Sequence, residues 1–429
     1  MTQATLFNAG EVRPTASLHR GDCLDVLRRM DDALVHAIVT DPPYGLSKEP
    51  DVAEVLAHWL AGDDYEHGGG GFMGKTWDSF VPGPSVWREC LRVLKPGGHL
   101  LCFAGSRTVD LMGISIRLAG FEVRDQMQWI YGSGLPKAQS VGKAIDKAHG
   151  VDAKEWDGWA TALKPAHEPI IVARKPLSAG GRKATVAANV LTHGTGALNV
   201  DASRIGFASD ADEAETKTKN RHGDFGSDAG AANTYGDFSS VAPVNYSAPG
   251  RWPANVILGH HRECEQDCHP DCPVPELDKQ SGVSKSTGGR TVNISKTSEI
   301  YGGGNGLGQD LSAVEVQGDP GFGDVGGASR FFYCAKASKS ERNADLPPGS
   351  RNTHPTVKPI KLMEYLVRLV TPAGGTVLDP YMGSGTTLVA AAHLGFHGIG
   401  IDRDDDNEYL PIVRMRLASI ADITEGNAP

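Results

Sequence analysis

The sequence predicts an α/β fold in which a mainly parallel sheet is interrupted by a long insertion. Strand-like and helix-like runs alternate in residues 18–175 and again in residues 329–420, which is typical of parallel strands joined by crossover helices. Between them, residues 176–328 are rich in Gly, Ser, Asn and Thr, a composition that predicts loops and weak strands. Residues 1–17 are expected to form an N-terminal extension and residues 421–429 a frayed tail.

Apolar runs and helical spacing locate the individual elements of both regions. Buried strands are expected at residues 34–40, 98–104, 121–129, 169–173, 376–378 and 399–401. Helices are expected at residues 86–94, 109–119, 360–370 and 386–394.

Composition narrows the class of protein. The 429 residues are 40% hydrophobic, which is ordinary for a globular protein. The sequence contains no run of about eighteen uncharged apolar residues, the length that would be needed to span a membrane. The first fifteen residues lack the basic-then-apolar pattern of a signal peptide, so a cytoplasmic location is expected. The net charge of -10 argues mildly against a nucleic-acid partner. Basic residues nevertheless cluster between residues 330 and 368, so the sequence is still compatible with a basic groove on an acidic protein.

The seven cysteines do not form a disulfide framework. Cys23, Cys90, Cys102 and Cys334 are scattered among apolar residues, as buried thiols in a reducing compartment would be.

The most informative segment is Asp41-Pro42-Pro43-Tyr44, which directly follows the strand at residues 34–40. Pro43 has no N–H, so the Pro42 carbonyl is left as an acceptor beside the Asp41 carboxylate. Together they could grip a planar amino group while Tyr44 stacks on the ring that carries it. The alternative is a strand that ends in a proline turn, with Tyr44 packed in the core.

A second segment, residues 379–387, joins the strand at 376–378 to the helix that follows. Gly383 and Gly385 allow close approach of a ligand, and the helix N-terminus offers free N–H groups to a carboxylate. Asp402 ends the next strand, where an acidic side chain can hold ribose hydroxyls. The pattern predicts a nucleoside cofactor rather than a merely structural unit. It disfavours ATP and NAD, because no Lys follows the glycines and only two glycines are placed for a dinucleotide.

These segments resemble motifs of a known family. Residues 41–44 resemble motif IV of the amino-methyltransferases, which methylate the exocyclic nitrogen of adenine or cytosine in DNA. Residues 379–387 resemble motif I of S-adenosylmethionine-dependent DNA methyltransferases, with Tyr381 where Phe is more usual and with Asp402 where Glu is more usual. Because the catalytic motif precedes the cofactor loop, the order resembles the β class, a circular permutation of the Rossmann-like methyltransferase sheet.

The resemblance implies a role for each region. Residues 18–175 would be the catalytic half, residues 329–420 the cofactor-binding half, and residues 176–328 an inserted target-recognition region. Three short segments, residues 132–137, 252–255 and 329–333, further resemble a phage and prophage branch of the class.

The resemblance also implies the site residues and the cofactor, S-adenosylmethionine. Residues 352–359 look like motif X, and residues 21–23 look like motif III, although Asp22 has the alternative role of a helix N-cap. The catalytic residues implied are Asp41, Pro42, Pro43 and Tyr44. The cofactor-binding residues implied are Asp22, Thr356, Lys358, Asp379, Tyr381, Gly383, Ser384, Gly385, Thr386 and Asp402.

The implied activity is site-specific methylation of adenine N6 in double-stranded DNA by base flipping, since Asp at the first position of motif IV leans toward adenine in this family. N4-cytosine methylation is the alternative. An RNA or protein-amide methyltransferase and an inactive DNA-binding relic are more distant ones. No nuclease or helicase motif occurs, so a restriction endonuclease partner would be a separate chain. Solitary action and a homodimer are equally compatible with the sequence.

Two further segments allow more than one interpretation. Cys264, Cys268 and Cys272, preceded by two histidines, could hold a structural zinc or could be free thiols in a turn-rich loop. The glycine-rich residues 68–78 could be a lid over a flipped base or a passive surface loop.

Overall fold

A computed structural model provides the fold, and two compact units divide the chain. The larger unit comprises Met1–Ser203, Pro253–Pro275 and Phe332–Pro429, and the smaller one comprises Arg204–Trp252 and Glu276–Phe331. The structure describes residues 13–68, 78–132, 134, 138–181, 184–207, 250–261, 263–264, 267–285, 290–291, 317–318, 325–335 and 341–426.

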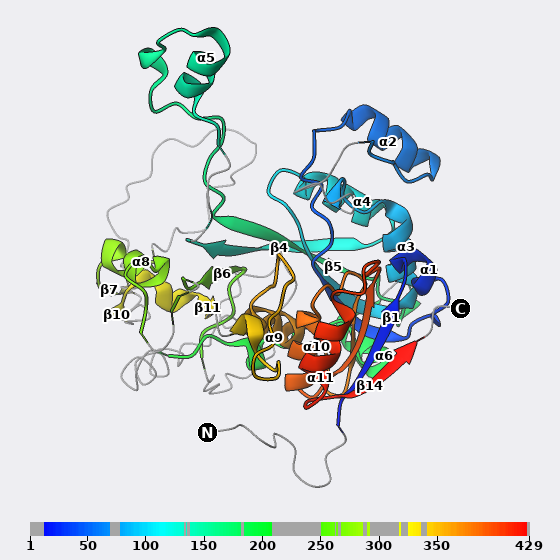
Figure 1. The fold of residues 1–429 in the computed structure, drawn as a ribbon. Helices are drawn as coiled ribbons and strands as arrows, with labels where there is room; N and C mark the ends of the chain where they lie inside the picture. The colour runs from blue at the N-terminus through cyan, green and yellow to red at the C-terminus, as the bar shows by residue number, and fades with distance from the viewer. Residues whose placement is uncertain are drawn as a thin grey trace, which may run out of the picture. The chain divides into compact units, whose positions relative to one another are not determined.

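The larger unit is built on one sheet of ten strands (Figure 1). From one edge to the other these are β11 (Tyr333–Ala335), β6 (Val256–Gly259), β4 (Glu122–Tyr131), β5 (His167–Arg174), β3 (Leu94–Phe103), β2 (Val35–Thr40), β12 (Thr376–Asp379), β13 (His397–Asp402), β1 (Thr15–Arg20) and β14 (Asp422–Gly426). Strand β5 is antiparallel to both of its neighbours, and every other pair in this sheet is parallel. The mainly parallel α/β fold is therefore confirmed.

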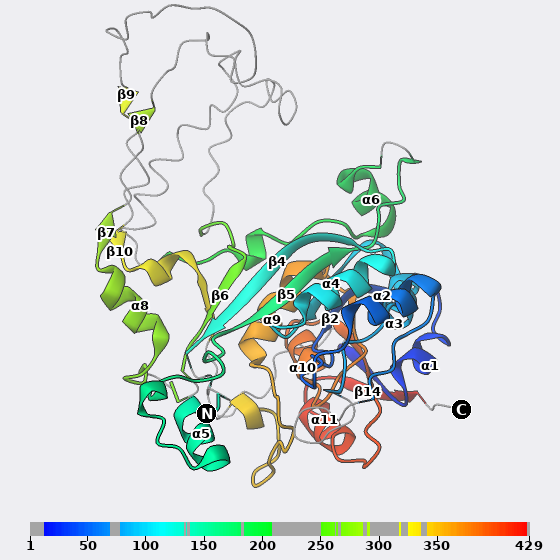
Figure 2. The same ribbon diagram turned by 90° about the horizontal axis from the view of Figure 1, so that it is seen from above.

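Helices cover both faces of the sheet (Figure 2). The larger unit contains α1 (Cys23–Leu27), α2 (Val52–Ala61), α3 (Pro84–Val93), α4 (Val109–Leu118), α5 (Val141–His149), α6 (Val186–His193), α9 (Ile360–Val370), α10 (Thr386–His393) and α11 (Leu410–Leu417). Helices α1, α3 and α4 pack on one face, whereas α9, α10 and α11 pack on the other.

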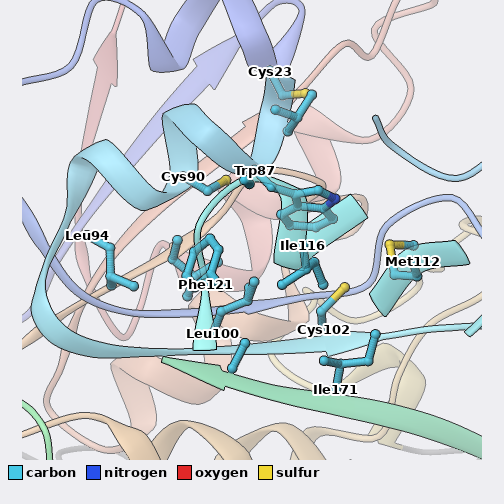
Figure 3. Close-up of a cluster of buried hydrophobic side chains, with 14 of the residues drawn as sticks. Cys23, Trp87, Cys90, Leu94, Leu100, Cys102, Met112, Ile116, Phe121 and Ile171 are labelled. Atoms are coloured by element: carbon cyan, nitrogen blue, oxygen red, sulfur yellow. The ribbon is translucent and has the colours of Figure 1, made fainter. Parts of the chain in front are cut away.

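The strands are buried on both faces because their apolar side chains alternate between two cores. In β3, Leu100 and Cys102 face the core under α3 and α4, and Leu101 and Phe103 face the core under α9. Figure 3 shows the first of these cores, with Trp87 of α3 above the sheet. Because both faces of these strands are buried, their sequences are continuous apolar runs and do not alternate between apolar and polar residues.

The ends of the chain differ from the expectation. Residues 421–429 were expected to be a tail, but Asp422–Gly426 form β14, which pairs with β1 at the edge of the sheet. In Figure 1 the red β14 lies beside the blue β1. Strand β1 itself begins at Thr15, inside the expected N-terminal extension. The polar run in β14 carries no apolar signal, because an edge strand is exposed on several sides.

The expected insertion is also divided differently. Helix α6 and strand β6 fall within residues 176–328, yet both belong to the larger unit, and β6 is part of the main sheet. The role of the region in target recognition stays a prediction. Within the described residues, no helix is long and apolar enough to cross a membrane.

The smaller unit is described only in part. Helix α8 (Pro273–Ser281) leads the chain into it, and two short antiparallel pairs follow: β7 (Ser284–Lys285) with β10 (Val325–Gly326), and β8 (Arg290–Thr291) with β9 (Gln317–Gly318). The backbone N–H and the hydroxyl of Ser329 donate to the Asp278 carboxylate at 2.7 and 2.6 Å. Most of the expected recognition region, and residues 69–77 of the glycine-rich loop, lie outside the described residues.

Leu100→Ala should lower the free energy of unfolding by about 2–5 kcal/mol, because it removes a fully buried side chain and leaves a cavity in the core under α3. The matched control is Leu60→Ala on α2, where the side chain is 73% exposed and little should change. Urea unfolding of both variants measures the difference, and equal losses would contradict the assigned core.

Candidate active site

The two motif segments meet because their strands are neighbours. Strands β2 and β12 pair in parallel, with Val377 opposite Ala37 and Leu378 opposite Ile38, so both chains leave the sheet at the same edge. A cavity of about 640 Å³ opens there. The expected residues that line it are Asp22, Asp41, Pro43, Thr356, Lys358, Asp379, Tyr381, Gly383, Ser384, Thr386 and Asp402. The other three expected residues, Pro42, Tyr44 and Gly385, are not among the lining residues.

A buried hydrogen bond joins the two segments. The Thr40 hydroxyl donates to Asp379 Oδ1 at 2.7 Å, and the Thr387 hydroxyl donates to Asp379 Oδ2 at 2.6 Å. Burial raises the pKa of Asp379 to about 6, although both hydroxyls oppose this rise. Both Asp379 oxygens are thus occupied by the protein, and the residue ties β2, β12 and α10 together at the cavity wall.

The glycine loop has the conformation that its sequence predicts. Gly383 and Gly385 have φ values of 52° and 74°, in the left-handed region that favours glycine. A Cβ atom at Gly383 would lie 2.8 Å from His354 Nε2, and one at Gly385 would lie 2.8 Å from Val413. The loop therefore packs backbone against side chains on two sides and leaves its outer face to the cavity.

Asp402 holds this loop in place. Its Oδ2 accepts the Gly383 N–H at 2.8 Å and its Oδ1 accepts the Asp404 N–H at 2.9 Å. Burial raises the pKa of Asp402 to about 6, against the effect of these two amides. Each carboxylate oxygen can accept a further hydrogen bond, so the side chain is free to take donors from the cavity.

A buried arginine that the sequence analysis missed lies beneath the loop. Arg416 of α11 is fully buried and donates from Nη1 to the Ser384 carbonyl at 2.7 Å and to the Thr386 hydroxyl at 3.2 Å. Burial lowers its pKa to about 10. Its sequence position carries no signal of burial, because arginines in helices are mostly exposed.

Asp22 has the capping role considered for it, and its role in cofactor binding stays a prediction. Its carboxylate accepts the Leu24 N–H at 2.9 Å and so caps α1, and the residue also lines the cavity. The neighbouring Cys23 is buried, which raises the pKa of its thiol to about 12 and keeps it protonated.

The backbone after the two prolines is held from outside the motif. Asp78 Oδ1 accepts the N–H groups of Tyr44 at 2.7 Å and Gly45 at 3.3 Å, and the Thr108 hydroxyl donates to the Tyr44 carbonyl at 2.6 Å. These two amides are therefore bound to Asp78 and do not turn back to the Pro42 carbonyl.

The tetrapeptide belongs to a partly buried polar cluster. The Tyr44 hydroxyl lies 2.7 Å from Asp41 Oδ1 and 2.9 Å from Glu168 Oε2, so its one proton is shared between two acceptors. Tyr131 donates to Glu168 Oε1 at 3.3 Å. Burial, Asp41 and Glu168 raise the pKa of Tyr44 well above its usual value, so its hydroxyl stays protonated.

Lys358 lines the cavity and also contacts the tetrapeptide. It was expected to bind cofactor, which stays a prediction, and its Nζ lies 2.6 Å from Asp41 Oδ2, 3.1 Å from Glu168 Oε2 and 3.1 Å from the Tyr44 hydroxyl. Burial opposes its charge, yet the two carboxylates outweigh burial and raise its pKa above the usual range. Lys358 is therefore an ammonium group held against the Asp41 carboxylate. The sequence shows the order of the motifs along the chain, and this order does not indicate which residues the end of a long side chain contacts.

Glu168 was missed for a topological reason. It lies in β5, close to the amino end of that strand, and the amino end of an antiparallel strand lies at the same sheet edge as the carboxyl ends of its parallel neighbours. A search for site residues that considers only the carboxyl ends of strands therefore does not find Glu168. Its position next to the apolar run at residues 169–173 was the available signal.

The three cysteines with a possible metal role come together in the larger unit. One ligand atom from each of Cys264, Cys268, Cys272 and also His260 lies within 4.8 Å of all the others. His260 was not among the expected ligands.

A sequence profile described as DNA methylase, of the N6/N4 type, matches residues 35–413. The match covers most of the chain and includes both the tetrapeptide and the glycine loop. The protein therefore belongs to the N6/N4 DNA methylase family.

Individual relatives match over shorter stretches. The type II methyltransferase M.HindIII of Haemophilus influenzae is 24% identical over 201 residues, which are 42% of this chain and 64% of that protein. M2.DpnII of Streptococcus pneumoniae is 50% identical over 64 residues, 15% of this chain and 23% of that protein. The chain thus spans less than two thirds of the length of either relative.

Solved structures of low sequence identity also align with the chain. A putative DNA modification methylase of Thermus thermophilus, complexed with S-adenosyl-L-methionine, has a TM-score of 0.38 and 17% identity, and covers 96% of this chain and 100% of that one. The cytosine-N4-specific PvuII DNA methyltransferase has a TM-score of 0.42 and 14% identity over 95% of this chain and 90% of that one. These TM-scores are low, so the family assignment rests on the profile match.

Lys358→Met should lower the free energy of unfolding by up to about 3 kcal/mol at neutral pH, because it leaves two carboxylates, each with a side chain that is only 20% exposed, without their cation. The control is Lys154→Met, since the ion pair between Lys154 and Asp152 has side chains that are 81% and 69% exposed and should contribute at most about 1 kcal/mol. Equal losses in urea unfolding would contradict the buried cluster.

Proposed function

We propose that the protein transfers a methyl group from S-adenosylmethionine to the exocyclic N6 of adenine in double-stranded DNA. The observation that carries the proposal is the placing of Asp41 and the glycine loop in the walls of one cavity. Hydrogen-bond acceptors for an amine and a site for a nucleoside cofactor would then lie side by side.

The cavity fits the proposed cofactor. Its volume of about 640 Å³ is within the usual range for a small-molecule site. Asp402 can still accept hydrogen bonds from ribose hydroxyls. Asp22 lines the cavity, where its carboxylate could accept a hydrogen bond from the adenine amine of the cofactor. The N-terminus of α10, beside Ser384, suits the cofactor's carboxylate. When bound, S-adenosylmethionine would supply a methyl group on a positively charged sulfur.

The catalytic residues would position the target amine. The lone pair of an exocyclic amine is delocalised into the ring, so the amine is a poor nucleophile. Asp41 and the Pro42 carbonyl would each accept one N–H and draw the nitrogen toward a tetrahedral geometry. Because the amine is paired inside a duplex, the base would have to flip out, and Tyr44 would offer a ring for stacking.

Lys358 gives this grip a further property. Its ammonium occupies Asp41 Oδ2 in the absence of substrate, so the target amine would share or replace that partner. Both oxygens of Asp41 already have partners, the Tyr44 hydroxyl at Oδ1 and the Lys358 ammonium at Oδ2. Positioning and electrostatics, rather than proton removal, would therefore supply most of the acceleration.

Adenine is preferred over cytosine because Asp41 stands at the first position of the tetrapeptide, where the family leans toward Asp for adenine. The phage or prophage branch, a homodimer and a separate endonuclease stay predictions of the sequence.

The test is to methylate unmodified plasmid DNA with the purified full chain and to map modified bases by single-molecule sequencing. N6-methyladenine at a fixed recognition sequence is expected. N4-methylcytosine would transfer the proposal to the alternative base, and unmodified DNA would refute it.

Asp41→Ala should reduce the rate of methyl transfer by more than about a hundredfold, because it removes the acceptor that holds the amine. Cofactor affinity, measured by calorimetry, should stay close to that of the parent. Asp146→Ala, on the exposed side of α5, is the control and should leave the rate unchanged. A parental rate in the Asp41 variant would exclude the proposed role.

Cofactor affinity should fall as the pH decreases through about 6, because protonated Asp402 is a poorer acceptor for ribose hydroxyls. The dissociation constant should rise up to about tenfold per pH unit below that value. Asp402→Asn should bind more weakly and flatten the profile. Asp379 also titrates near pH 6, but it is present in the parent and in Asp402→Asn, so it does not account for a difference between their profiles. His354 lines the same cavity but has a pKa of about 4 and does not titrate in this range. An unaltered profile in the variant would assign the effect to another group.

A further inference from the structure

A cluster of soft metal ligands lies outside the catalytic cavity, at the end of a strand of the main sheet. Strand β6 ends at Gly259, and the chain then passes through His260, Cys264, Cys268 and Cys272 before α8 begins at Pro273. The ligand atoms of these four residues all lie within 4.8 Å of one another. We propose that the four residues bind one structural Zn²⁺ ion.

The distances suit a tetrahedral site. His260 Nδ1 lies 3.5 Å from Cys268 Sγ and 3.4 Å from Cys272 Sγ. In a tetrahedron with Zn–S bonds of about 2.3 Å and Zn–N bonds of about 2.0–2.1 Å, nitrogen and sulfur ligands are about 3.6 Å apart. Nδ1 therefore faces the thiols at the separation that a shared ion would impose.

The backbone around the thiols supports the same assignment. The His269 N–H donates to Cys264 Sγ at 3.2 Å, and the His261 N–H donates to Cys272 Sγ at 3.5 Å. Amide donors of this kind stabilise sulfur that carries negative charge, as a metal-bound thiolate does. Cys264 and Cys272 are fully buried, where uncompensated thiolates would be costly and a bound cation removes the cost.

The ligand set indicates a structural ion rather than a catalytic one. Three cysteines and one histidine complete a four-coordinate shell and leave no position for water or substrate. The four ligands are also spaced every four residues along the chain, from His260 to Cys272. This regularity becomes visible only when His260, rather than His261, is counted as the first ligand.

A second group of side chains nearby is the competing metal site. His261, Glu263 and His269 also have ligand atoms within 4.8 Å of one another. The rings of His261 and His269 are stacked with centroids 4.4 Å apart, and His269 Nε2 lies 3.6 Å from Glu263. Stacked rings point their nitrogens side by side instead of toward a common centre, so the cysteine cluster is preferred.

The ion would anchor the chain where it leaves the sheet. The His260 N–H donates to the Ala335 carbonyl of β11 at 2.9 Å, and Cys272 lies directly before α8. Through these two residues, Zn²⁺ would connect the outer strands β6 and β11 to the start of the helix that leads into the smaller unit. None of the four ligands lines the catalytic cavity, so this role is independent of the proposed methyl transfer.

The test is the metal content of the full chain, purified without chelators and measured by plasma mass spectrometry. One zinc per chain is expected in the parent. His260→Ala and Cys268→Ser should each lose it, whereas the adjacent control His261→Ala should retain it. Cofactor affinity, measured in parallel, verifies that each variant is folded, since the cofactor cavity is formed by other residues.

Replacement of the ion by Co²⁺ gives a second readout. Thiolate-to-cobalt charge-transfer bands should appear in the parent and in His261→Ala, and they should be weakened in Cys268→Ser. Loss of zinc from His261→Ala but not from His260→Ala would assign the ion to the competing group. A parent that binds no zinc after reduction and reconstitution, or that contains a disulfide among the three cysteines as purified from reducing cells, would overturn the proposal.

Discussion

The hydrogen bond between Thr40 and Asp379 is the interaction on which the rest of the site depends. The two residues are 339 positions apart in the chain, and their side chains meet in the buried interior at 2.7 Å. Thr40 directly precedes Asp41, and Asp379 begins the glycine loop, so the bond sets the distance between the proposed amine-binding residue and the proposed cofactor loop. It can form only because β2 and β12 are paired in parallel and release both segments at one edge.

The second constraint is electrostatic. Asp41 lies with Lys358, Glu168 and Tyr44 in a buried cluster, and burial of ions is generally unfavourable unless their geometry and hydrogen bonding are good. Hydrophobic side chains would fill this volume at lower cost in free energy. The cluster is better explained by the proposed function, because it orients the Asp41 carboxylate for an amine. An ammonium group is also a fair substitute for the amine that would displace it.

Much of this arrangement could be predicted from sequence because buried parallel strands and glycine loops leave strong local signals. Apolar runs predicted β2 and β12, and the left-handed conformation at Gly383 follows from the residue itself. The exposed edge strand β14, by contrast, is polar and leaves no such signal. Lys358 and Glu168 reach Asp41 from distant strands and loops, and their positions depend on tertiary packing. Two histidines precede the cysteines in the sequence, and only the folded chain shows that His260 is the one whose nitrogen meets the thiols.

The central claim is that one cavity brings a cofactor methyl group to an amine held by Asp41. The most direct measurement uses S-adenosylmethionine with a deuterated methyl group, duplex DNA and the purified full chain, followed by digestion and mass spectrometry of the nucleosides. The account predicts that the intact labelled methyl group appears on N6 of deoxyadenosine and on no other nucleoside. Labelled methyl groups on ring carbons, or none on any nucleoside while the cofactor is bound, would contradict it.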